Sequence, residues 1–389
     1  MHRFLVVSRM MLAILGTIVV CQAQDCVDHS CREANAKDLQ LASPTYVYAA
    51  LAGPLNGIGS IAQFQLLRNG TLKPLNPATI AAGGASDDFA PSVVVNPGGR
   101  YLYAENVDSE TISKYCISVT GTLSRCATLR FEFFAMAFAH NGQIAVVTNT
   151  KGINSYRTSP TGAMSLISTV PAASAGGPVV VDPKGKFVYV VNESISTISE
   201  YSLSASGRLA PLAPTNTVAT GWLPFYAAFS PQGFLYSVNY GAGTISEYSM
   251  DSITGVLTLT DTVLTGLTSG FGSQPRWISF DPSGAFAYVG NVYDNTISQF
   301  SVDSATGVLT RNGADVPTSW APLQVVVDPS GKFVFSADED GEIMQFLINK
   351  DGTLAANGRV FTGSIYEGFP FGIMFAQPRI VNSIDPRLR

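Results

Sequence analysis

Histidine is scarce in this sequence, and its scarcity limits the chemistry that the chain can perform. The 389 residues hold three histidines, His2, His29 and His140, which are far apart in the chain. The sequence also lacks a His-x-x-x-His or paired-cysteine metal pattern, a Gly-x-Ser-x-Gly turn and a phosphate-binding glycine loop. We therefore predict no Ser–His–Asp or zinc-hydrolase mechanism, no metal site and no cofactor.

Charged residues are also few, at 13% of the chain, and basic residues are in the minority. Lys and Arg total 23 against 28 Asp and Glu, so the formal net charge is −5. Because a chain of this charge repels a phosphate backbone, nucleic acid is not an expected partner. Hydrophobic residues reach 46%, and 36 Gly and 22 Pro supply the turns that a protein of many short strands needs.

A hydrophobic run marks the amino terminus. Two arginines flank the start of the apolar stretch Met10–Val20, and a small residue follows at Ala23, so residues 1–23 read as a signal peptide. The run is shorter than the roughly 20 residues of a membrane-spanning helix. We therefore expect a secreted or periplasmic protein. Membrane association would require a lipid on Cys21, and Val20 departs from the small residue of a lipoprotein signal.

The five cysteines leave two candidate pairs after the signal peptide. Cys116 and Cys126 lie on adjacent strands of one expected hairpin, with the parity that places both on the same face. We predict a disulfide between them, which suits an oxidising compartment. Cys26 and Cys31 can close a small loop before the first strand; a metal site there would need more ligands than the nearby His29.

One phrase recurs along the chain: a short apolar run, a Pro/Gly turn, an aromatic-rich strand and an Asn. Its clearest copies are residues 178–192 and 277–291. From Pro97 through the matching positions of the later copies, the steps are 43, 43, 48, 51 and 47 residues. A period in this range, with several short strands in each unit, indicates a β-propeller.

Each repeat predicts four strands, A to D, and the chain ends predict how the ring closes. Residues 46–76 supply strands B, C and D without a strand A, and residues 370–375 read as a strand A with nothing after it. Joining them completes a seventh blade and removes exposed sheet edges. We predict an all-β fold, a single seven-bladed propeller of four-stranded antiparallel blades over residues 46–375. A leader (24–45) precedes it and a tail (376–389) follows.

The polar residues of the repeat have structural explanations. Asn and Asp tolerate left-handed turns and bond their own backbone, so we expect a turn role for the residues that end strand B. These are Asn106, Asn149, Asn192, Asn239, Asn291 and Asp338. The segment 338–342 alternates carboxylates with a Gly, as calcium loops do, but lacks their full spacing.

The large aromatic residues gather in the loops that lead from strand D into strand A. All three tryptophans, Trp222, Trp277 and Trp320, lie in or beside these loops. The same loops hold further aromatic and charged residues: Asp87, Asp88, Phe89, Phe225, Tyr226, Phe271, Arg276, Tyr366, Glu367 and Phe369. In a propeller these loops open at one mouth of the central channel, where such residues would form a concave ligand site. The alternative for each Trp is packing between blades.

The strand pattern Phe-Val-Tyr-Val-Val-Asn, followed by Thr-Ile-Ser-Glu-Tyr and joined with Asp-Pro-Ser-Gly turns, resembles the seven-bladed lactonase-like propellers. These include the propeller type of 6-phosphogluconolactonase and proteins with Tyr-Val-Thr-Asn repeats. The resemblance covers nearly all of residues 46–375 and is most specific over Gln274–Gly284. In the lactonases the corresponding phrase reads Pro-Arg-His, with the Arg and His in the active site. Arg276 matches this Arg, whereas Trp277 takes the place of the His.

The resemblance implies hydrolysis of a lactone, and export favours an unphosphorylated sugar-type substrate. As a hydrolase the protein would use Arg276 to hold the developing oxyanion, and Asp87, Asp88 or Glu367 to activate water. The expected ligand contacts are the aromatic residues of the mouth: Trp222, Tyr226, Trp277, Trp320 and Tyr366. The alternative is a propeller without enzymatic activity that binds a glycan, a small ligand or a protein at the same mouth.

Overall fold

The computed structural model describes residues 44–51, 58–85, 93–106, 110–130, 134–174, 177–212, 217–267, 272–362 and 370–377. Apart from Pro44, these residues belong to one compact unit, Thr45–Arg379. The expected signal peptide with Cys21, and the pair Cys26 and Cys31, lie outside the described residues. In the described ranges, no helix has the length and apolar character needed to cross a membrane.

The described strands form seven sheets, called blades 1 to 7 here, and each strand is antiparallel to its neighbours. From strand A to strand D, blade 1 has β30 (Pro370–Ala376), β1 (Thr45–Leu51), β2 (Ile58–Leu66) and β3 (Leu72–Ala85); blade 2 has β4 (Val93–Val95), β5 (Tyr101–Asn106), β6 (Thr111–Ile117) and β7 (Leu123–Arg130); blade 3 has β8 (Ala135–Ala139), β9 (Ile144–Asn149), β10 (Gly152–Thr158) and β11 (Met164–Val170).

The remaining blades follow the same order. Blade 4 has β12 (Val179–Val181), β13 (Phe187–Asn192), β14 (Thr197–Leu203), β15 (Leu209–Pro211) and β16 (Thr217–Ala219); blade 5 has β17 (Pro224–Phe229), β18 (Leu235–Asn239), β19 (Thr244–Met250) and β20 (Leu257–Leu264); blade 6 has β21 (Pro275–Phe280), β22 (Phe286–Asn291), β23 (Thr296–Val302), β24 (Leu309–Arg311) and β25 (Val316–Pro317); blade 7 has β26 (Pro322–Val327), β27 (Phe333–Asp338), β28 (Glu342–Ile348) and β29 (Leu354–Phe361). Two 3₁₀ turns, η1 (His140–Gly142) and η2 (Glu193–Ile195), complete the described elements.

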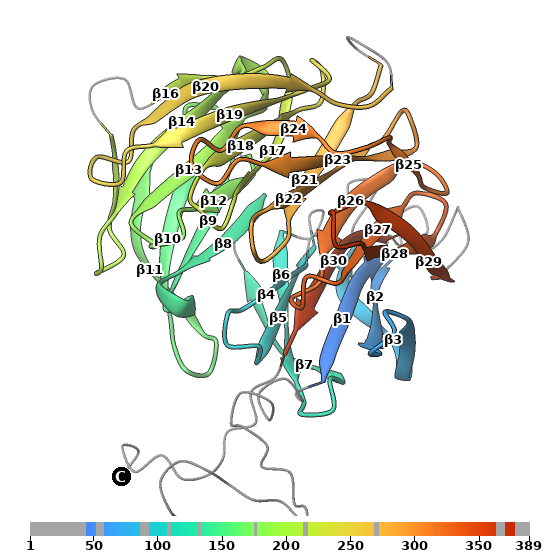
Figure 1. Cartoon of the computed structure of the whole chain (residues 1–389). Helices are drawn as coiled ribbons and strands as arrows, with labels where there is room; N and C mark the ends of the chain where they lie inside the picture. Colours follow the sequence, from blue (N-terminus) through green and yellow to red (C-terminus); the bar gives the residue numbers. More distant parts are fainter. Residues whose placement is uncertain are drawn as a thin grey trace, which may run out of the picture. The chain divides into compact units, whose positions relative to one another are not determined.

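The seven-bladed architecture and its closure by the C-terminal strand are confirmed. β30 pairs with β1 from Tyr46 opposite Ala376 to Leu51 opposite Pro370. Figure 1 shows this red C-terminal strand beside the blue N-terminal one. In blades 4 and 6 strand D consists of two separate strands, and both pair with strand C. They are β15 and β16 in blade 4, and β24 and β25 in blade 6. The repeat pattern of the sequence does not predict this split.

The blades pack against one another through seven apolar clusters, one at each interface between neighbouring blades. Strand B of blade 4 is apolar on both faces because each face packs against a neighbouring blade. Its Phe187 and Tyr189 belong to the cluster shared with blade 5, whereas Val188 and Val190 belong to the cluster shared with blade 3. Successive side chains of a strand point to opposite faces, and in this ring both faces are interior.

Strand B also explains the glycine of each strand C–D turn. The hydroxyl of Tyr189 donates a 2.6 Å hydrogen bond to the carbonyl of Gly255 in blade 5. Gly255 has φ +78°, and a Cβ there would lie 2.2 Å from the Phe187 ring. The aromatic strand of one blade and the glycine turn of the next therefore act together. Equivalent bonds join Tyr48 to Gly121, Tyr103 to Gly162, Tyr236 to Gly307 and Tyr288 to Gly352.

A buried Glu or Gln in strand C makes a second link between blades. Glu247 accepts hydrogen bonds of 3.3 Å from the backbone N–H of Leu309 in blade 6. The same link runs from Gln63 to Leu123, from Glu200 to Leu257 and from Gln299 to Leu354. Burial raises the pKa of Glu247 to about 7, and the bond from Leu309 opposes this effect only in part.

We expect Glu247→Gln to stabilise the protein at pH 8 and to reduce the pH dependence of its stability. The raised pKa of folded Glu247 means that its contribution is complete below about pH 4.5 and is lost as the pH rises through about 7. A Gln keeps an acceptor for the N–H of Leu309, just as Gln299 of blade 6 accepts from the N–H of Leu354. The variant should therefore gain about 1–2 kcal/mol at pH 8 and little at pH 5, measured by urea unfolding. The exposed Glu193→Gln serves as a control, and identical pH profiles for Glu247→Gln and the wild type would contradict the expectation.

The residues that end strand B make structural hydrogen bonds, and the turn role that we expected for all of them is seen for Asn149. Asn149 bonds its own turn, accepting from the N–H groups of Lys151 and Gly152. In blades 2, 4, 5 and 6 the Asn side chain instead donates to a Thr and a Ser of strand C; in blade 5 Asn239 donates to Thr244 and Ser246. The prediction of bonds to the backbone was wrong for these blades, because strand C places two hydroxyls opposite the amide.

Candidate functional site

The candidate site lies at the end of the ring where the strands A begin, and this end is called the mouth here. The loops from strand D to strand A meet the strand B–C turns there. Backbone bonds join the two sets, from Ala242 N–H to the Trp222 carbonyl and from Glu339 N–H to the Trp320 carbonyl. Five of the predicted site residues are described: Trp222, Tyr226, Arg276, Trp277 and Trp320. The other four lie outside the described residues: Asp87, Asp88, Tyr366 and Glu367.

A β-bulge sets the direction of Arg276. In blade 6, Pro275 pairs with Asn291 and Trp277 pairs with Gly290, so Arg276 between them has no partner on β22. The same bulge leaves Phe225 in blade 5 and Leu323 in blade 7 as the extra, unpaired residue of strand A. Each of them directly follows the proline that opens the strand. A bulge bends the strand and redirects the side chain of its extra residue. The repeat therefore turns one side chain out of the regular strand alternation in three consecutive blades.

The residue before each of these prolines is strained. Leu223, Gln274 and Ala321 have φ values of +48°, +47° and +37°. A residue before proline normally adopts extended backbone, and a non-glycine residue with positive φ is uncommon. Strain of this kind costs on the order of 1–3 kcal/mol per residue and is concentrated at functional sites. Its recurrence in blades 5, 6 and 7 favours a functional role for these loops.

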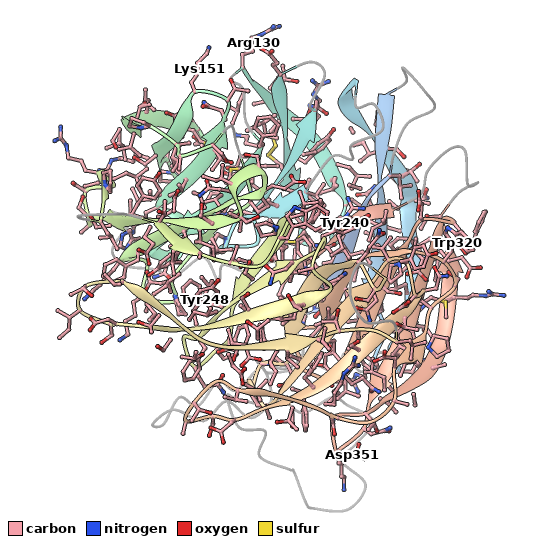
Figure 2. The ribbon with its side chains drawn as sticks, turned by 90° about the horizontal axis from the view of Figure 1, so that it is seen from above. Arg130, Lys151, Tyr240, Tyr248, Trp320 and Asp351 are labelled. Carbon is pink, nitrogen blue, oxygen red and sulfur yellow. A yellow bond between two sulfur atoms is a disulfide. The ribbon has the colours of Figure 1, made fainter. Side chains whose placement is uncertain are left out.

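Arg276 lies against an aromatic ring, beside a hydrogen bond between two neighbouring polar residues. Its guanidinium carbon lies 4.7 Å from the centre of the Phe225 ring. The Tyr240 hydroxyl donates a 2.8 Å hydrogen bond to the side-chain oxygen of Gln274, and Figure 2 shows Tyr240 towards the middle of the view. Among the described residues no carboxylate forms an ion pair with Arg276. The guanidinium can therefore offer its N–H donors to a ligand.

Burial is the main influence on the pKa of Arg276. It lowers the pKa of the guanidinium, whereas Tyr240 and the carboxylate of Glu339 act in the opposite direction. The side chain stays cationic, because the ordinary pKa of a guanidinium lies far above neutral pH. A cation that is partly removed from water interacts more strongly with a negative charge that develops beside it.

Tyr226 and Trp277 stack on each other across the interface of blades 5 and 6. Their ring centres are 3.6 Å apart and their planes differ by 16°. Tyr226 also packs against the apolar cluster between these blades. One face of each ring is thus covered by the other, as expected for a Trp that packs between blades. The ligand contacts predicted for these two residues stay a prediction.

Trp222 and Trp320 are more exposed. The exposed fractions are 51% for Trp222 and 57% for Trp320, and Tyr293 in the strand B–C turn of blade 6 reaches 67%. Figure 2 shows Trp320 at the edge of the view. These three exposed aromatic residues, one each in blades 5, 6 and 7, are called the exposed aromatic rim here.

Strand B anchors the two loops that carry these tryptophans. The Asn239 side-chain oxygen accepts a 2.9 Å bond from the Thr220 hydroxyl. In blade 7 Asp338 takes this role and accepts from the N–H and the hydroxyl of Ser319, at 2.9 and 2.8 Å. Burial raises the pKa of Asp338 to about 6. Asp338 thus positions the Trp320 loop. Within the described ranges no three His, Cys, Asp or Glu residues are placed to hold a metal ion.

Three residues of this site were not predicted: Tyr240, Gln274 and Glu339. Tyr240 and Glu339 each follow directly after the strand B residue that anchors a loop. Aligning the strand B–C turns of all repeats would have shown Glu339 as an acidic residue beside the mouth. Gln274 lies within the stretch that resembles the lactonases, at the position before the proline.

The predicted cysteine pair lies away from the mouth, in blade 2. Cys116 and Cys126 form a disulfide with their Cα atoms 5.8 Å apart. A bulge in the pairing of β6 with β7 leaves Cys126 as the extra residue, since Tyr115 pairs with Arg125 and Lys114 with Ala127.

Several proteins of similar sequence or fold are named as lactonases. The profile of the family described as "Lactonase, 7-bladed beta-propeller" matches residues 138–277 and 260–365. A 6-phosphogluconolactonase of Pectobacterium carotovorum is 26% identical over 269 residues, which cover 64% of this chain and 77% of that protein. The structure of a periplasmic gluconolactonase of Pseudomonas aeruginosa has a TM-score of 0.69 at 18% identity, covering 86% of this chain and 100% of that one.

A third similar structure is that of a putative 6-phosphogluconolactonase from Bacteroides fragilis. Its TM-score is 0.68 at 20% identity, and the match covers 86% of this chain and 98% of that one. At this level of identity the two solved structures show the fold, whereas the family profile spans more than half of the chain. With its seven closed blades and the matched repeats, the chain belongs to the family of seven-bladed β-propeller lactonases.

Proposed function

We propose that this protein is an exported hydrolase of an unphosphorylated, sugar-type lactone, and that the reaction takes place at the mouth. The observation that carries the proposal is Arg276, which a bulge turns out of the strand and which rests on the Phe225 ring. Its guanidinium is partly desolvated, and no described carboxylate pairs with it. Relatives named for lactone substrates support this class of reaction.

In the proposed reaction a water oxygen attacks the lactone carbonyl, and the carbonyl oxygen becomes an oxyanion. Arg276 stabilises that oxyanion through its N–H donors. A carboxylate accepts the proton of the attacking water, the ring C–O bond breaks, and the leaving alkoxide takes up a proton. Glu339 is the described carboxylate whose charge acts on the pKa of Arg276. Asp87, Asp88 and Glu367 remain candidates for the base.

An unphosphorylated substrate is favoured by the charges around Arg276. The carboxylate of Glu339 acts on the pKa of this guanidinium, and among the described residues no second cation does. A phosphate group with two negative charges would have to approach that carboxylate, which costs free energy. A neutral lactone avoids this repulsion. The expected signal peptide supports the same conclusion, since phosphorylated sugar lactones are cytosolic metabolites.

We expect purified mature protein to hydrolyse glucono-1,5-lactone with a kcat/KM at least tenfold above that for 6-phosphogluconolactone. Acid release would be followed in a pH-stat near pH 6.5 and corrected for the spontaneous reaction. γ-Butyrolactone and an aryl lactone test whether a sugar ring is required. A preference for the phosphorylated lactone would overturn the substrate assignment, and no turnover of any lactone would overturn the activity.

The exposed aromatic rim favours one second candidate, a propeller that binds a glycan without hydrolysing a lactone. Trp222, Tyr293 and Trp320 are exposed, and sugars stack on exposed aromatic rings. The same purified protein on a glycan array separates the two functions. Glycan binding without lactone turnover would favour the binding protein, and turnover without glycan binding would favour the hydrolase.

A further inference from the structure

A pocket lies at the end of the ring opposite the mouth, between blades 2 and 3. The strand A–B and C–D turns meet at this end, since strand A runs away from the mouth. The pocket has a volume of about 380 Å³, within the range of small-molecule sites. Among the residues that line it are Arg100, Tyr101, Gln143 and Arg157.

The lining is basic because carboxylates that other blades carry are absent from it. In blades 4, 6 and 7 the strand A–B turn is held by a buried aspartate that accepts backbone bonds: Asp182, Asp281 and Asp328. In blade 2 the same bonds go to the neutral Asn96, at 2.9 Å from Arg100 N–H and 2.8 Å from Tyr101 N–H. The lining itself contains no Asp or Glu.

Both arginines keep donors for a ligand. Arg157 uses one N–H to bond the Ser206 carbonyl at 2.9 Å, out of the five that a guanidinium carries. Arg100 is exposed, and no carboxylate of the described residues pairs with it. A third cation lies close by, since the Lys114 ammonium is 4.9 Å from the centre of the Tyr101 ring. Three positive charges therefore gather here in a chain whose net charge is −5.

The backbone of blade 3 departs from the repeat at this pocket. The other strand A–B turns place a glycine in the left-handed region, for example Gly99 at φ +65° and Gly185 at +70°. In blade 3 two non-glycine residues also adopt it, His140 at +49° and Asn141 at +56°. Asn141 lines the pocket. Such strain persists at ligand sites, where the surrounding structure fixes the conformation.

We propose that this pocket binds a small polyhydroxylated anion, a sugar acid or a sugar phosphate, through Arg100 and Arg157. Guanidinium groups match the geometry of carboxylate and phosphate oxygens. The side chains of Asn96, Asn141 and Gln143 supply amide groups for hydroxyls, and the Tyr101 ring supplies an apolar face. The site is separate from the mouth and does not depend on lactone hydrolysis.

Calorimetric titration of the mature protein with gluconate, glucose 6-phosphate and glucose tests this assignment. We expect saturable binding of at least one of the two anions at low salt and no binding of glucose. Raising NaCl to 0.3 M should weaken the binding, because exposed charges are screened. Arg100→Gln/Arg157→Gln should weaken it at least tenfold. Lys184→Gln/Lys332→Gln removes two exposed charges from the equivalent turns of blades 4 and 7 and should leave it unchanged.

The remaining controls concern the fold and the mouth. Arg276→Gln should leave anion binding intact, because Arg276 lies at the mouth. If Arg157→Gln lowers the melting temperature by losing its bond to Ser206, the single variant Arg100→Gln decides instead. Three results would overturn the proposal: no binding of either anion, equal loss in both double variants, or loss in Arg276→Gln rather than in the pocket variant.

Discussion

Replacing Arg276 by alanine should lower the kcat/KM for lactone hydrolysis by a factor of about 10²–10³, the usual effect of losing one oxyanion donor. The guanidinium already lies against the Phe225 ring and is partly removed from water, so the proposed mechanism requires no reorganisation of it during the reaction. No described residue stands ready to replace it, because the equivalent bulge positions carry Phe225 and Leu323. Steady-state kinetics on the best lactone of the substrate screen measure the effect.

Two further variants separate this role from a general loss of structure. Arg276→Lys keeps the charge but loses the planar fork of donors, so it should recover only a part of the activity. Arg359→Ala removes an arginine that pairs with Glu342 on blade 7, and it should leave kcat/KM unchanged. Circular dichroism and melting curves show whether each variant is folded. Full activity in a folded Arg276→Ala variant would remove Arg276 from the mechanism.

The fold was predictable because its information is repeated and local. Each blade restates the apolar alternation and the glycine turn, and in five of the blades a strand B tyrosine bonds the turn glycine of the next, as Tyr189 bonds Gly255. The unpaired segments at the two ends of the repeat then required β30 to join β1. The split strands β16 and β25 were not predictable in this way, because they interrupt the pattern in blades 4 and 6 alone.

The candidate site was predictable only in its position. The loops that enter strand A were expected at one mouth, and Arg276 was found through its resemblance to a family phrase. The bulge that redirects Arg276 depends on the pairing of Pro275 with Asn291, which no local pattern records. Likewise, the action of Glu339 on Arg276 joins residues of two blades. Contacts between blades depend on the closed ring, and spacing along one strand does not reveal them.

Ending the chain after Phe369, which removes β30, should abolish the cooperative folding of the propeller. β1 would lose its inner partner from Tyr46 to Leu51, and Phe335 in blade 7 would lose the Phe375 ring whose centre lies 5.6 Å away. The fully buried Ile373 would also vanish from the cluster that joins blades 7 and 1. Losing this strand should cost on the order of 5–10 kcal/mol, comparable with the whole stability of a typical domain. Soluble yield and the melting transition measure the outcome.

Two matched variants decide whether the cause is the missing strand or the missing length. A chain that ends after Gln377 keeps β30 and should melt as the wild type does. A permuted chain with residues 370–377 joined by a short glycine linker ahead of Thr45 should restore folding. The geometry allows it, since the Gln377 side chain bonds the Thr45 hydroxyl at 3.0 Å and β30 runs antiparallel to β1. If the chain without β30 melts cooperatively near the wild-type temperature, blade 1 does not need its fourth strand, and the ring is stable without this closure.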